Sequence, residues 1–394
     1  MRRVALALSI ALLVAFTYGR AGASPSLTPK DALERLFTAD HVDSNWFAQS
    51  FLDQVSAAQV ETIIGQLKSQ LGAFQSVEAQ RSKFRVIFAR GDDMASIALD
   101  DSGRITGLFF EVAQPRASSF QGALDAFKDL PGRVSVTVLE NGAERAAVSR
   151  DLALGVGSTF KLAVLDALKQ RIDAGKTSWQ SIIRLQARNK SLPSGELQNW
   201  PDGSPLDVFS LAAVMISNSD NTAADTLLAY VGRRNVEAFA PRDRPFLSTR
   251  EAFILKDPNR ADILKRYRAA NESGRRSLLK EIDALPLPDV SIFSGGPLAT
   301  DVEWFFSTRE LCALMRNVET LPLMSINPGV AEASDWKRVA YKGGSEPGVL
   351  NLTTWLVAKS GTTYCVSATW NNDKPLEETT FFGLYKSLLA NLQT

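Results

Sequence analysis

The sequence predicts an α+β fold, with an antiparallel five-stranded sheet, flanking helices and an inserted helical region, preceded by a small α+β domain. Two strand-like runs surround Asn141-Gly142, a dipeptide that favours a two-residue hairpin turn, and three further runs follow near the C-terminus. The long stretch between these groups has apolar residues at helical spacing. The leading and trailing strands are therefore expected to pair in one sheet around the helical insertion.

The three trailing strands are the runs WKRVAYKGG, VLNLTTWLVA and TTYCVSATWN, which are joined by the turns EPG and KSGT. The last segment, TTFFGLYKSLLANL, is amphipathic and can cover one face of the sheet.

The N-terminal part of the chain is expected to form a separate small domain. Apolar residues repeat at helical spacing over Pro29–Thr38 and Ser56–Leu71, and the period changes to strand-like runs between Phe84 and Glu111, with the turn signal DDSG between the last two. Two helices followed by an antiparallel meander make an α+β unit. The expected division is a signal peptide over 1–23, a small domain over 24–113, a linker over 114–119 and a second domain over 120–394.

The expected signal peptide begins with a basic segment, continues with an apolar run that is short for a membrane span, and ends with small residues at Ala21 and Ala23. Cleavage after Ala23 implies a periplasmic or secreted protein. Arg20 leaves open the alternative of a retained anchor. No other stretch is long and apolar enough to span a membrane, so no stable span is expected after cleavage.

Composition excludes several kinds of function. The chain has 44 basic and 43 acidic residues, which gives no electrostatic reason to expect a nucleic-acid partner. The one histidine, His41, cannot complete a zinc site with two distant cysteines and is expected at the surface or in a cap. Cys312 and Cys365 lie in apolar segments and are expected as free, buried thiols, although an exported chain can oxidise such a pair. Any nucleophile here must use a base other than histidine.

The first candidate motif is Ser158-Thr159-Phe160-Lys161, at the start of an apolar-periodic helix. Residues three apart share a helix face, so the Lys161 amine can reach the Ser158 hydroxyl. Backbone N–H groups at a helix start also favour negative charge on the serine oxygen or on a bound carboxylate. Burial, together with the cation of Lys342, is expected to lower the pKa of Lys161 and make it a base. An S-x-x-K string also occurs by chance, so it needs support.

The second motif, Ser219-Asp220-Asn221, lies at the break between two helical runs. Ser219 is expected to relay a proton from Lys161 to a leaving group, and Asn221 to hold a substrate carbonyl. Asp220 is expected to be a structural cap. The alternative for all three is an ordinary helix N-terminus, because each is a good capping residue.

The third motif is Lys342-Gly343-Gly344-Ser345, at the end of a strand. Glycines weaken a strand unless something approaches the backbone closely, as a substrate along an edge strand does. The N–H groups of Ser345 and Ser158 are expected to form an oxyanion hole. A glycine bulge is the alternative.

Together and in this order, the motifs match the S-x-x-K, S-D-N and K-T-G set of class A β-lactamases and penicillin-binding proteins. From about Ser119 to the C-terminus the chain resembles class A β-lactamases, above all in GSTFKLAVLDAL and MISNSDNTAAD. Gly343 stands where that family usually has threonine or serine, which is expected to weaken recognition of a substrate carboxylate. With its leading domain and the segments RPFLSTREAF and DVEWFFSTRELCALM, the chain is similar to the β-lactamase-related serine hydrolases of clavulanic-acid gene clusters.

The resemblance implies a β-lactamase/transpeptidase-like fold and an exported serine hydrolase that forms an acyl-enzyme on Ser158, with Lys161 as base and neither cofactor nor metal. Small β-lactam, ester and D-Ala-D-Ala-type substrates remain open. So do a β-lactam sensor that is acylated without turnover and a wall-associated binding protein that uses residues 24–113. The sequence leaves the oligomeric state open.

Deacylation is where the chain departs most from the family it resembles. Class A enzymes activate the hydrolytic water through an E-x-x-L-N loop, and the sequence contains no such string. Ser248 and Glu251 lie in the corresponding stretch, where Glu251 is expected to be a solvated loop glutamate rather than the base. Slow β-lactam turnover is therefore expected.

Overall fold

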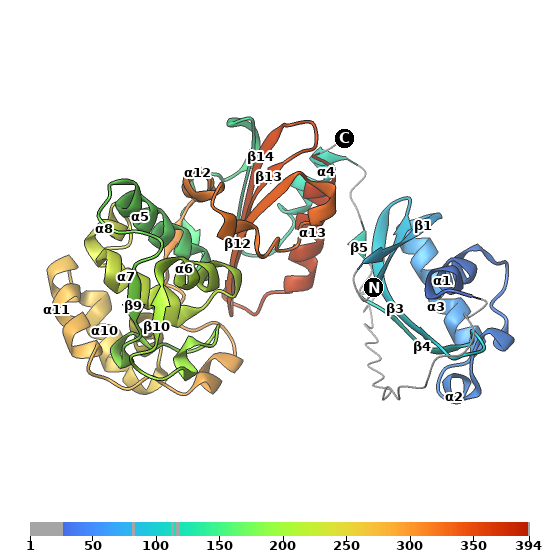
Figure 1. Ribbon diagram of the computed structural model, residues 1–394, viewed down its shortest axis with the longest axis horizontal. Coiled ribbons are helices and arrows are strands. Elements are labelled where there is room, and N and C mark those ends of the chain that lie inside the picture. Colours follow the sequence, from blue (N-terminus) through green and yellow to red (C-terminus); the bar gives the residue numbers. More distant parts are fainter. Residues whose placement is uncertain (1–26, 81–82, 112–113, 116–118, 393–394) are drawn as a thin grey trace. The chain divides into compact units, whose positions relative to one another are not determined.

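The computed structural model describes residues 27–80, 83–111, 114–115 and 119–392. The expected signal peptide lies outside these residues, as does part of the expected linker. The chain divides into two compact units, 1–118 and 119–394, and each is described by itself (Figure 1).

In the N-terminal unit, helices pack on a curved antiparallel meander in the order β1-β2-β3-β4, with β5 paired to β3. Thr28 and Ser56 begin the two longer helices through capping boxes. The two predicted helices and the predicted turn at Asp100–Gly103 are present, but strand β1 was not expected. The elements are α1 (Pro29–Thr38), α2 (Gln49–Leu52), α3 (Ala57–Leu71), β1 (Phe74–Gln80), β2 (Lys83–Phe88), β3 (Gly91–Leu99), β4 (Ile105–Phe110) and β5 (Gln114–Pro115).

The C-terminal unit contains the predicted five-stranded antiparallel sheet, in the order β12-β13-β14-β6-β7. Asn141 and Gly142 both have positive φ in the β6–β7 hairpin, as the turn prediction requires. Strand β12 is at an edge, and this position exposes its outer side to the catalytic motifs. The five strands are β6 (Arg133–Glu140), β7 (Ala143–Val148), β12 (Arg338–Glu346), β13 (Val349–Val357) and β14 (Thr363–Asn371).

Helices cover both faces of this sheet. Helices α4 and α13 pack together, and Tyr385 of α13 donates a hydrogen bond to the Val366 carbonyl of the sheet, while α12 and α5 lie on the other face. The inserted region between the two groups of strands is mostly helical, as predicted. The helices are α4 (Phe120–Ala126), α5 (Lys161–Asp173), α6 (Val208–Ser217), α7 (Asn221–Val231), α8 (Arg233–Glu237), α9 (Thr249–Leu255), α10 (Ala261–Ala269), α11 (Glu272–Ile282), α12 (Thr308–Val318) and α13 (Glu378–Ala390). Short strands are β8 (Leu154–Gly155), β9 (Ile182–Arg184), β10 (Pro205–Asp207) and β11 (Phe305–Phe306).

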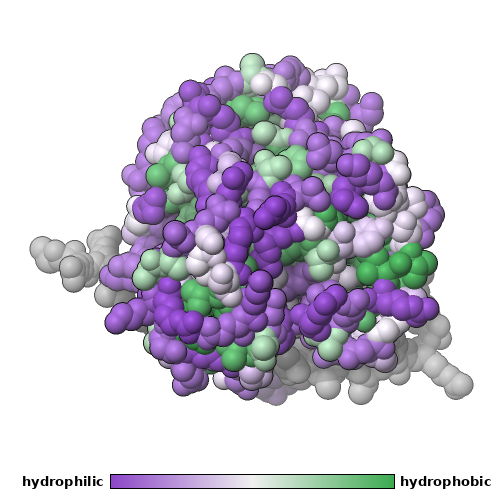
Figure 2. Space-filling model, turned by 90° about the vertical axis from the view of Figure 1, so that its left-hand side faces the viewer, coloured by the Kyte–Doolittle hydropathy of each residue, from purple (hydrophilic) through white to green (hydrophobic). Residues whose placement is uncertain are grey.

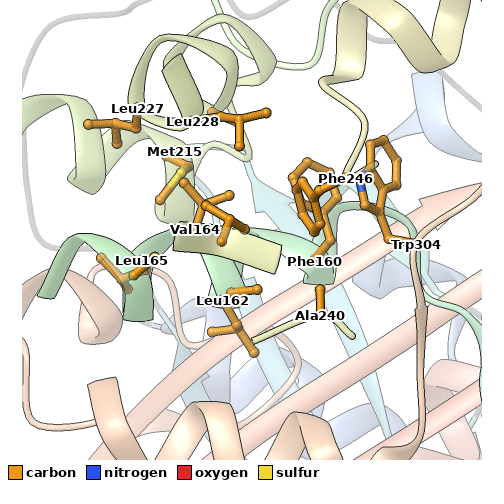
Figure 3. Packing of buried hydrophobic residues seen from close by; sticks show 14 of the residues in the cluster. Phe160, Leu162, Val164, Leu165, Met215, Leu227, Leu228, Ala240, Phe246 and Trp304 are labelled. Carbon is orange, nitrogen blue, oxygen red and sulfur yellow. The ribbon is translucent and has the colours of Figure 1, made fainter. Parts of the chain in front are cut away.

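The core of the C-terminal unit surrounds the start of α5 (Figure 3). Phe160 stacks on Trp304 with ring centroids 3.9 Å apart, and Phe246 meets Phe160 edge-on. Leu162 and Val164 are fully buried in the next turn. Because α5 is packed on nearly every side, the residues at its start are held in place by the core.

The prediction of free thiols is wrong, because Cys312 of α12 and Cys365 of β14 form a disulfide. The predicted burial of both residues is confirmed, since both are fully buried. Burial alone does not distinguish a free thiol from a bridged one. The packing of α12 on β14 brings the two residues together across a sequence separation of 53.

The surface on the side of α10 and α11 is mainly hydrophilic, with hydrophobic side chains in small scattered groups (Figure 2). Among the described residues, no helix combines the length and apolar character that a membrane crossing needs.

Candidate active site

Ser158 lies in the short 3-10 helix Gly157–Phe160, which runs directly into α5. Gly157 has φ +49°, and a Cβ there would lie 3.0 Å from the Ser345 nitrogen, so the position needs glycine. The Gly157 N–H donates to Glu303 Oε2 at 3.1 Å, which fixes the turn before the serine. The predicted placement of Ser158 at the start of a helix is what the structure shows.

Lys161 is completely buried, and its amine lies among four oxygens. Nζ donates to the Ser219 carbonyl at 2.5 Å and to Asn221 Oδ1 at 2.7 Å, and it lies 3.0 Å from Ser158 Oγ. Burial, followed by the charge of Lys342, lowers the pKa of Lys161 well below its usual value. A neutral amine has two N–H donors and one lone pair. With both donors used by the two carbonyl-type oxygens, the lone pair is left for the Ser158 hydroxyl.

Ser219 connects the first lysine to the second. It has φ +56°, in the left-handed region, between α6 and α7, and this strained backbone turns its hydroxyl toward both amines. Ser219 Oγ lies 3.1 Å from Lys161 Nζ and 3.0 Å from Lys342 Nζ. Asp220 caps α7 through the Ala223 N–H, the structural role expected for it.

Lys342 is buried on edge strand β12, and burial lowers its pKa to about 7. The lysine therefore changes charge near neutral pH, and a bound anion would favour its protonated form.

Gly344 is required by the protein backbone itself rather than by a ligand. A Cβ at this position would lie 2.3 Å from the Val156 carbonyl oxygen and 2.4 Å from the Ser158 nitrogen. The sequence pattern predicts that this glycine makes room for a substrate on the edge strand. In the structure, the approaching backbone is the turn that carries the serine, and this contact places Ser345 beside Ser158.

Asn221 was expected to hold a substrate carbonyl, but its amide is already bonded within the protein. Oδ1 accepts from Lys161, and Nδ2 donates to the Leu192 carbonyl at 3.0 Å. These contacts make Asn221 an orienting partner of Lys161. Contact between Asn221 and substrate stays a prediction.

A cavity of about 430 Å³ opens over these residues. Its wall includes Ser158, Ser219, Asn221, Gly344 and Ser345. Its further lining includes Phe160, Leu192, Pro193, Ser194, Thr249, Phe253, Val290, Phe293, Glu303, Trp304, Tyr341, Gly343, Glu346, Pro347, Leu350, Leu352 and Phe382, together with Gly157. Within the described part of the chain, no group of histidine, cysteine and carboxylate side chains is arranged to hold a metal ion.

Ser248 and Glu251 do not line this cavity. Ser248 is the N-cap of α9, and Glu251 closes the capping box by accepting from the Ser248 N–H at 2.7 Å. Glu251 also pairs with Arg233 through both carboxylate oxygens, at 2.9 and 2.7 Å, and is 1% exposed. The expectation of a solvated loop glutamate is therefore wrong. The residue is a buried structural anchor, turned away from the cavity.

Two carboxyl groups of the cavity lining, Glu303 and Glu346, and the lysine that pairs with them, Lys256, were not predicted from the sequence. Lys256 is buried and pairs with Glu303 at 2.8 Å and with Glu346. Burial and the neighbouring carboxylate of Glu303 raise the pKa of Glu346 well above its usual value. In this part of the cavity the described residues provide carboxyl groups but no free cation, because Lys256 is shared by both glutamates.

Comparison with known proteins supports a β-lactamase-like fold. Residues 115–246 match the model of the beta-lactamase enzyme family, a segment that includes Ser158, Lys161, Ser219 and Asn221 but ends before Lys342. The antiparallel five-stranded sheet with its inserted helices is β-lactamase-like, as the sequence predicted. No curated protein matches the chain.

Among solved structures, the chain is similar to the β-lactamase from Sphaerobacter thermophilus DSM 20745, with 21% identity, coverage of 70% of this chain and 98% of that chain, and a TM-score of 0.49. It is also similar to PBP-A, with 15% identity, coverage of 71% of this chain and 98% of that chain, and a TM-score of 0.48. A β-lactamase from Chitinophaga pinensis DSM 2588 gives 17% identity, 69% and 97% coverage and a TM-score of 0.47.

Proposed function

We propose that this protein is a serine hydrolase that forms an acyl-enzyme on Ser158, with Lys161 as the base. The observation that carries the proposal is the position of the Lys161 amine. It is buried, its donors are used by Ser219 and Asn221, and it lies 3.0 Å from Ser158 Oγ. A lysine kept neutral beside a serine is a known way to activate a nucleophile without histidine.

Acylation follows from this geometry in three steps. Lys161 accepts the Ser158 proton as Ser158 Oγ attacks the substrate carbonyl. The N–H groups of Ser158 and Ser345 stabilise the oxyanion. Ser219, within hydrogen-bond distance of both lysines, then passes a proton from Lys161 to the leaving group, and the carbonyl–leaving-group bond breaks.

Slow deacylation of β-lactams is part of the proposal. Release of the acyl group needs a base near a water on the ester, and removal of a general base typically reduces the rate roughly 10²- to 10⁴-fold. Glu251 is bound to Arg233 away from the cavity. Glu303 is bound to Lys256 and the Gly157 N–H, and Glu346 is bound to Lys256 as well. Each of these three carboxyl groups is therefore already bound within the protein rather than free to activate a water.

Export is the second part of the proposal. The sequence of residues 1–23 has the features of a signal peptide. The Cys312–Cys365 disulfide supports an oxidising compartment, such as the periplasm or the exterior. We further propose that residues 24–113 form an independent domain, whose sheet also includes Gln114–Pro115 through pairing with β3. The rest of the expected linker 114–119 joins it to the hydrolase domain over 120–394.

Three substrates separate the remaining alternatives. Stopped-flow traces with nitrocefin, a simple ester and a D-Ala-D-Ala peptide report acylation and turnover for each. A burst of one equivalent followed by a slow steady state is expected with nitrocefin. Fast turnover of the ester or peptide alone would identify an esterase or peptidase. A stable adduct without any steady state would identify a β-lactam sensor. No reaction with any of them would contradict the proposal.

A further inference from the structure

Tyr341 fills the space that a side chain at position 343 would occupy. A Cβ built on Gly343 would lie 2.1 Å from Tyr341 Oη and 2.9 Å from its Cζ. The two residues are two apart on strand β12 and therefore share a face. The missing side chain of Gly343 thus leaves room for a phenol.

The Tyr341 ring is held from a second side by Gly329. A Cβ there would lie 2.5 Å from the ring, so only glycine lets the ring pack so closely on this loop. With glycine on both sides, the hydroxyl is positioned by the backbone rather than by flexible neighbours. Such preorganisation is what a binding group requires.

The Tyr341 hydroxyl is available to a ligand. The residue lines the cavity that contains Ser158, and no described residue forms a hydrogen bond with its Oη. Burial raises the pKa of Tyr341, so the phenol keeps its proton and remains a donor. A partly buried donor without a partner is costly unless a ligand or water completes it.

The charges around the cavity indicate which ligand group this donor meets. Lys342 follows Tyr341 on β12, so its side chain starts from the other face of the strand, but its amine lies 3.0 Å from Ser219 Oγ, and Ser219 also lines the cavity. Elsewhere in the wall, Glu303 and Glu346 face a single lysine, Lys256, which they already bind. An anionic group is therefore favoured near Lys342 and disfavoured near the two glutamates.

We propose that Tyr341 is a specificity-determining residue whose hydroxyl donates a hydrogen bond to the carboxylate of the acylating substrate, in place of a side chain at position 343. This inference rests on the proposed function, because the carboxylate belongs to the molecule that acylates Ser158. In this proposal, the hydroxyl two residues earlier offsets the weaker carboxylate recognition that Gly343 is expected to cause.

The test compares benzylpenicillin with its methyl ester, which differ only in the carboxylate. The second-order rate constant of acylation is measured by intact mass for the wild type and Tyr341→Phe. A lost hydrogen bond to a charged group predicts a rate roughly 10- to 100-fold lower with benzylpenicillin. The rate with the methyl ester should stay within about 3-fold of the wild type, because no carboxylate is present to lose the bond. Tyr364→Phe, which removes a hydroxyl bonded to the Leu392 carbonyl, is the matched control and should change neither rate.

A second variant moves the hydroxyl. Tyr341→Ala should lose the preference for benzylpenicillin over the ester, and adding Gly343→Thr should restore at least part of it, since the removed phenol vacates the space for threonine. Equal rates for Tyr341→Phe and the wild type with benzylpenicillin would overturn the inference. So would an equal loss with both compounds, which would show a merely structural role. Absence of acylation in the wild type would overturn the proposed function as well.

Discussion

Replacing Lys161 with alanine tests the assignment of the base. The amine lies 3.0 Å from Ser158 Oγ, and no other amine is as close to it among the described residues. Loss of a positioned general base should slow acylation roughly 10²- to 10⁴-fold, or about 3–5 kcal/mol in the barrier. The Ser219 carbonyl and Asn221 Oδ1 lose a donor, but removing a buried amine also removes its desolvation cost. The change in folding stability should therefore be small beside the change in rate.

The pH dependence of acylation makes this test sharper. The active form of Lys161 is neutral, and burial lowers its pKa, so the wild type should acylate at neutral pH and slow down as acid protonates the amine. Rates with a fluorescent penicillin, followed by intact mass between acidic and neutral pH, should show this acid limb. Lys169→Ala, on the same helix and paired with Asp173 outside the site, is the matched control. The reasoning is refuted if Lys161→Ala keeps both the wild-type rate and the acid limb.

Three further predictions concern the scaffold. Glu251→Gln should lower the free energy of unfolding by about 1–3 kcal/mol, because it weakens the buried pair with Arg233. The rate of deacylation should not change. A selective loss of turnover at unchanged stability would instead make Glu251 the missing base. Replacing Cys312 and Cys365 with serine should lower the free energy of unfolding by about 4 kcal/mol, as chain entropy predicts for a sequence separation of 53. Urea unfolding measures this change, and an unchanged unfolding midpoint would contradict the disulfide. A chain that begins near Ala117 should fold and label with penicillin; its aggregation, with the full chain soluble, would show that the N-terminal unit covers apolar surface.

Local sequence signals predicted the elements whose causes are local. The β6–β7 hairpin follows from Asn141-Gly142, which supplies the two positive φ angles of the turn. Helix α3 follows from its apolar spacing and from the cap at Ser56. Strand β1, Phe74–Gln80, was missed because most of its residues are polar or small, and only Val77 is buried. Pairing with β2 makes it a strand, and this contact has no signal in the segment itself.

The same division holds for the site. Ser158 and Lys161 are three residues apart, so helix geometry predicted their contact. Ser219 and Lys342 were placed by motif order, since their hydrogen bond spans 123 residues and cannot be derived from spacing.

The position of Tyr341 and the grouping of Lys256 with Glu303 and Glu346 had no motif to indicate them. They arise only when separate segments pack around the cavity. The solvent exposure of Glu251 was predicted wrongly for a related reason, because its partner Arg233 lies on another helix.

The central claim is that Ser158 is acylated quickly and released slowly, and a time course of intact mass with a fluorescent penicillin tests it most directly. The wild type should gain one adduct per chain within the first turnover and lose it slowly. Acylation has its nucleophile, base and proton relay, whereas deacylation lacks a base to activate the water. Ser158→Ala, with its fold confirmed by circular dichroism, should gain none. Labelling of Ser158→Ala at another residue, or steady hydrolysis by the wild type without an adduct, would contradict the account.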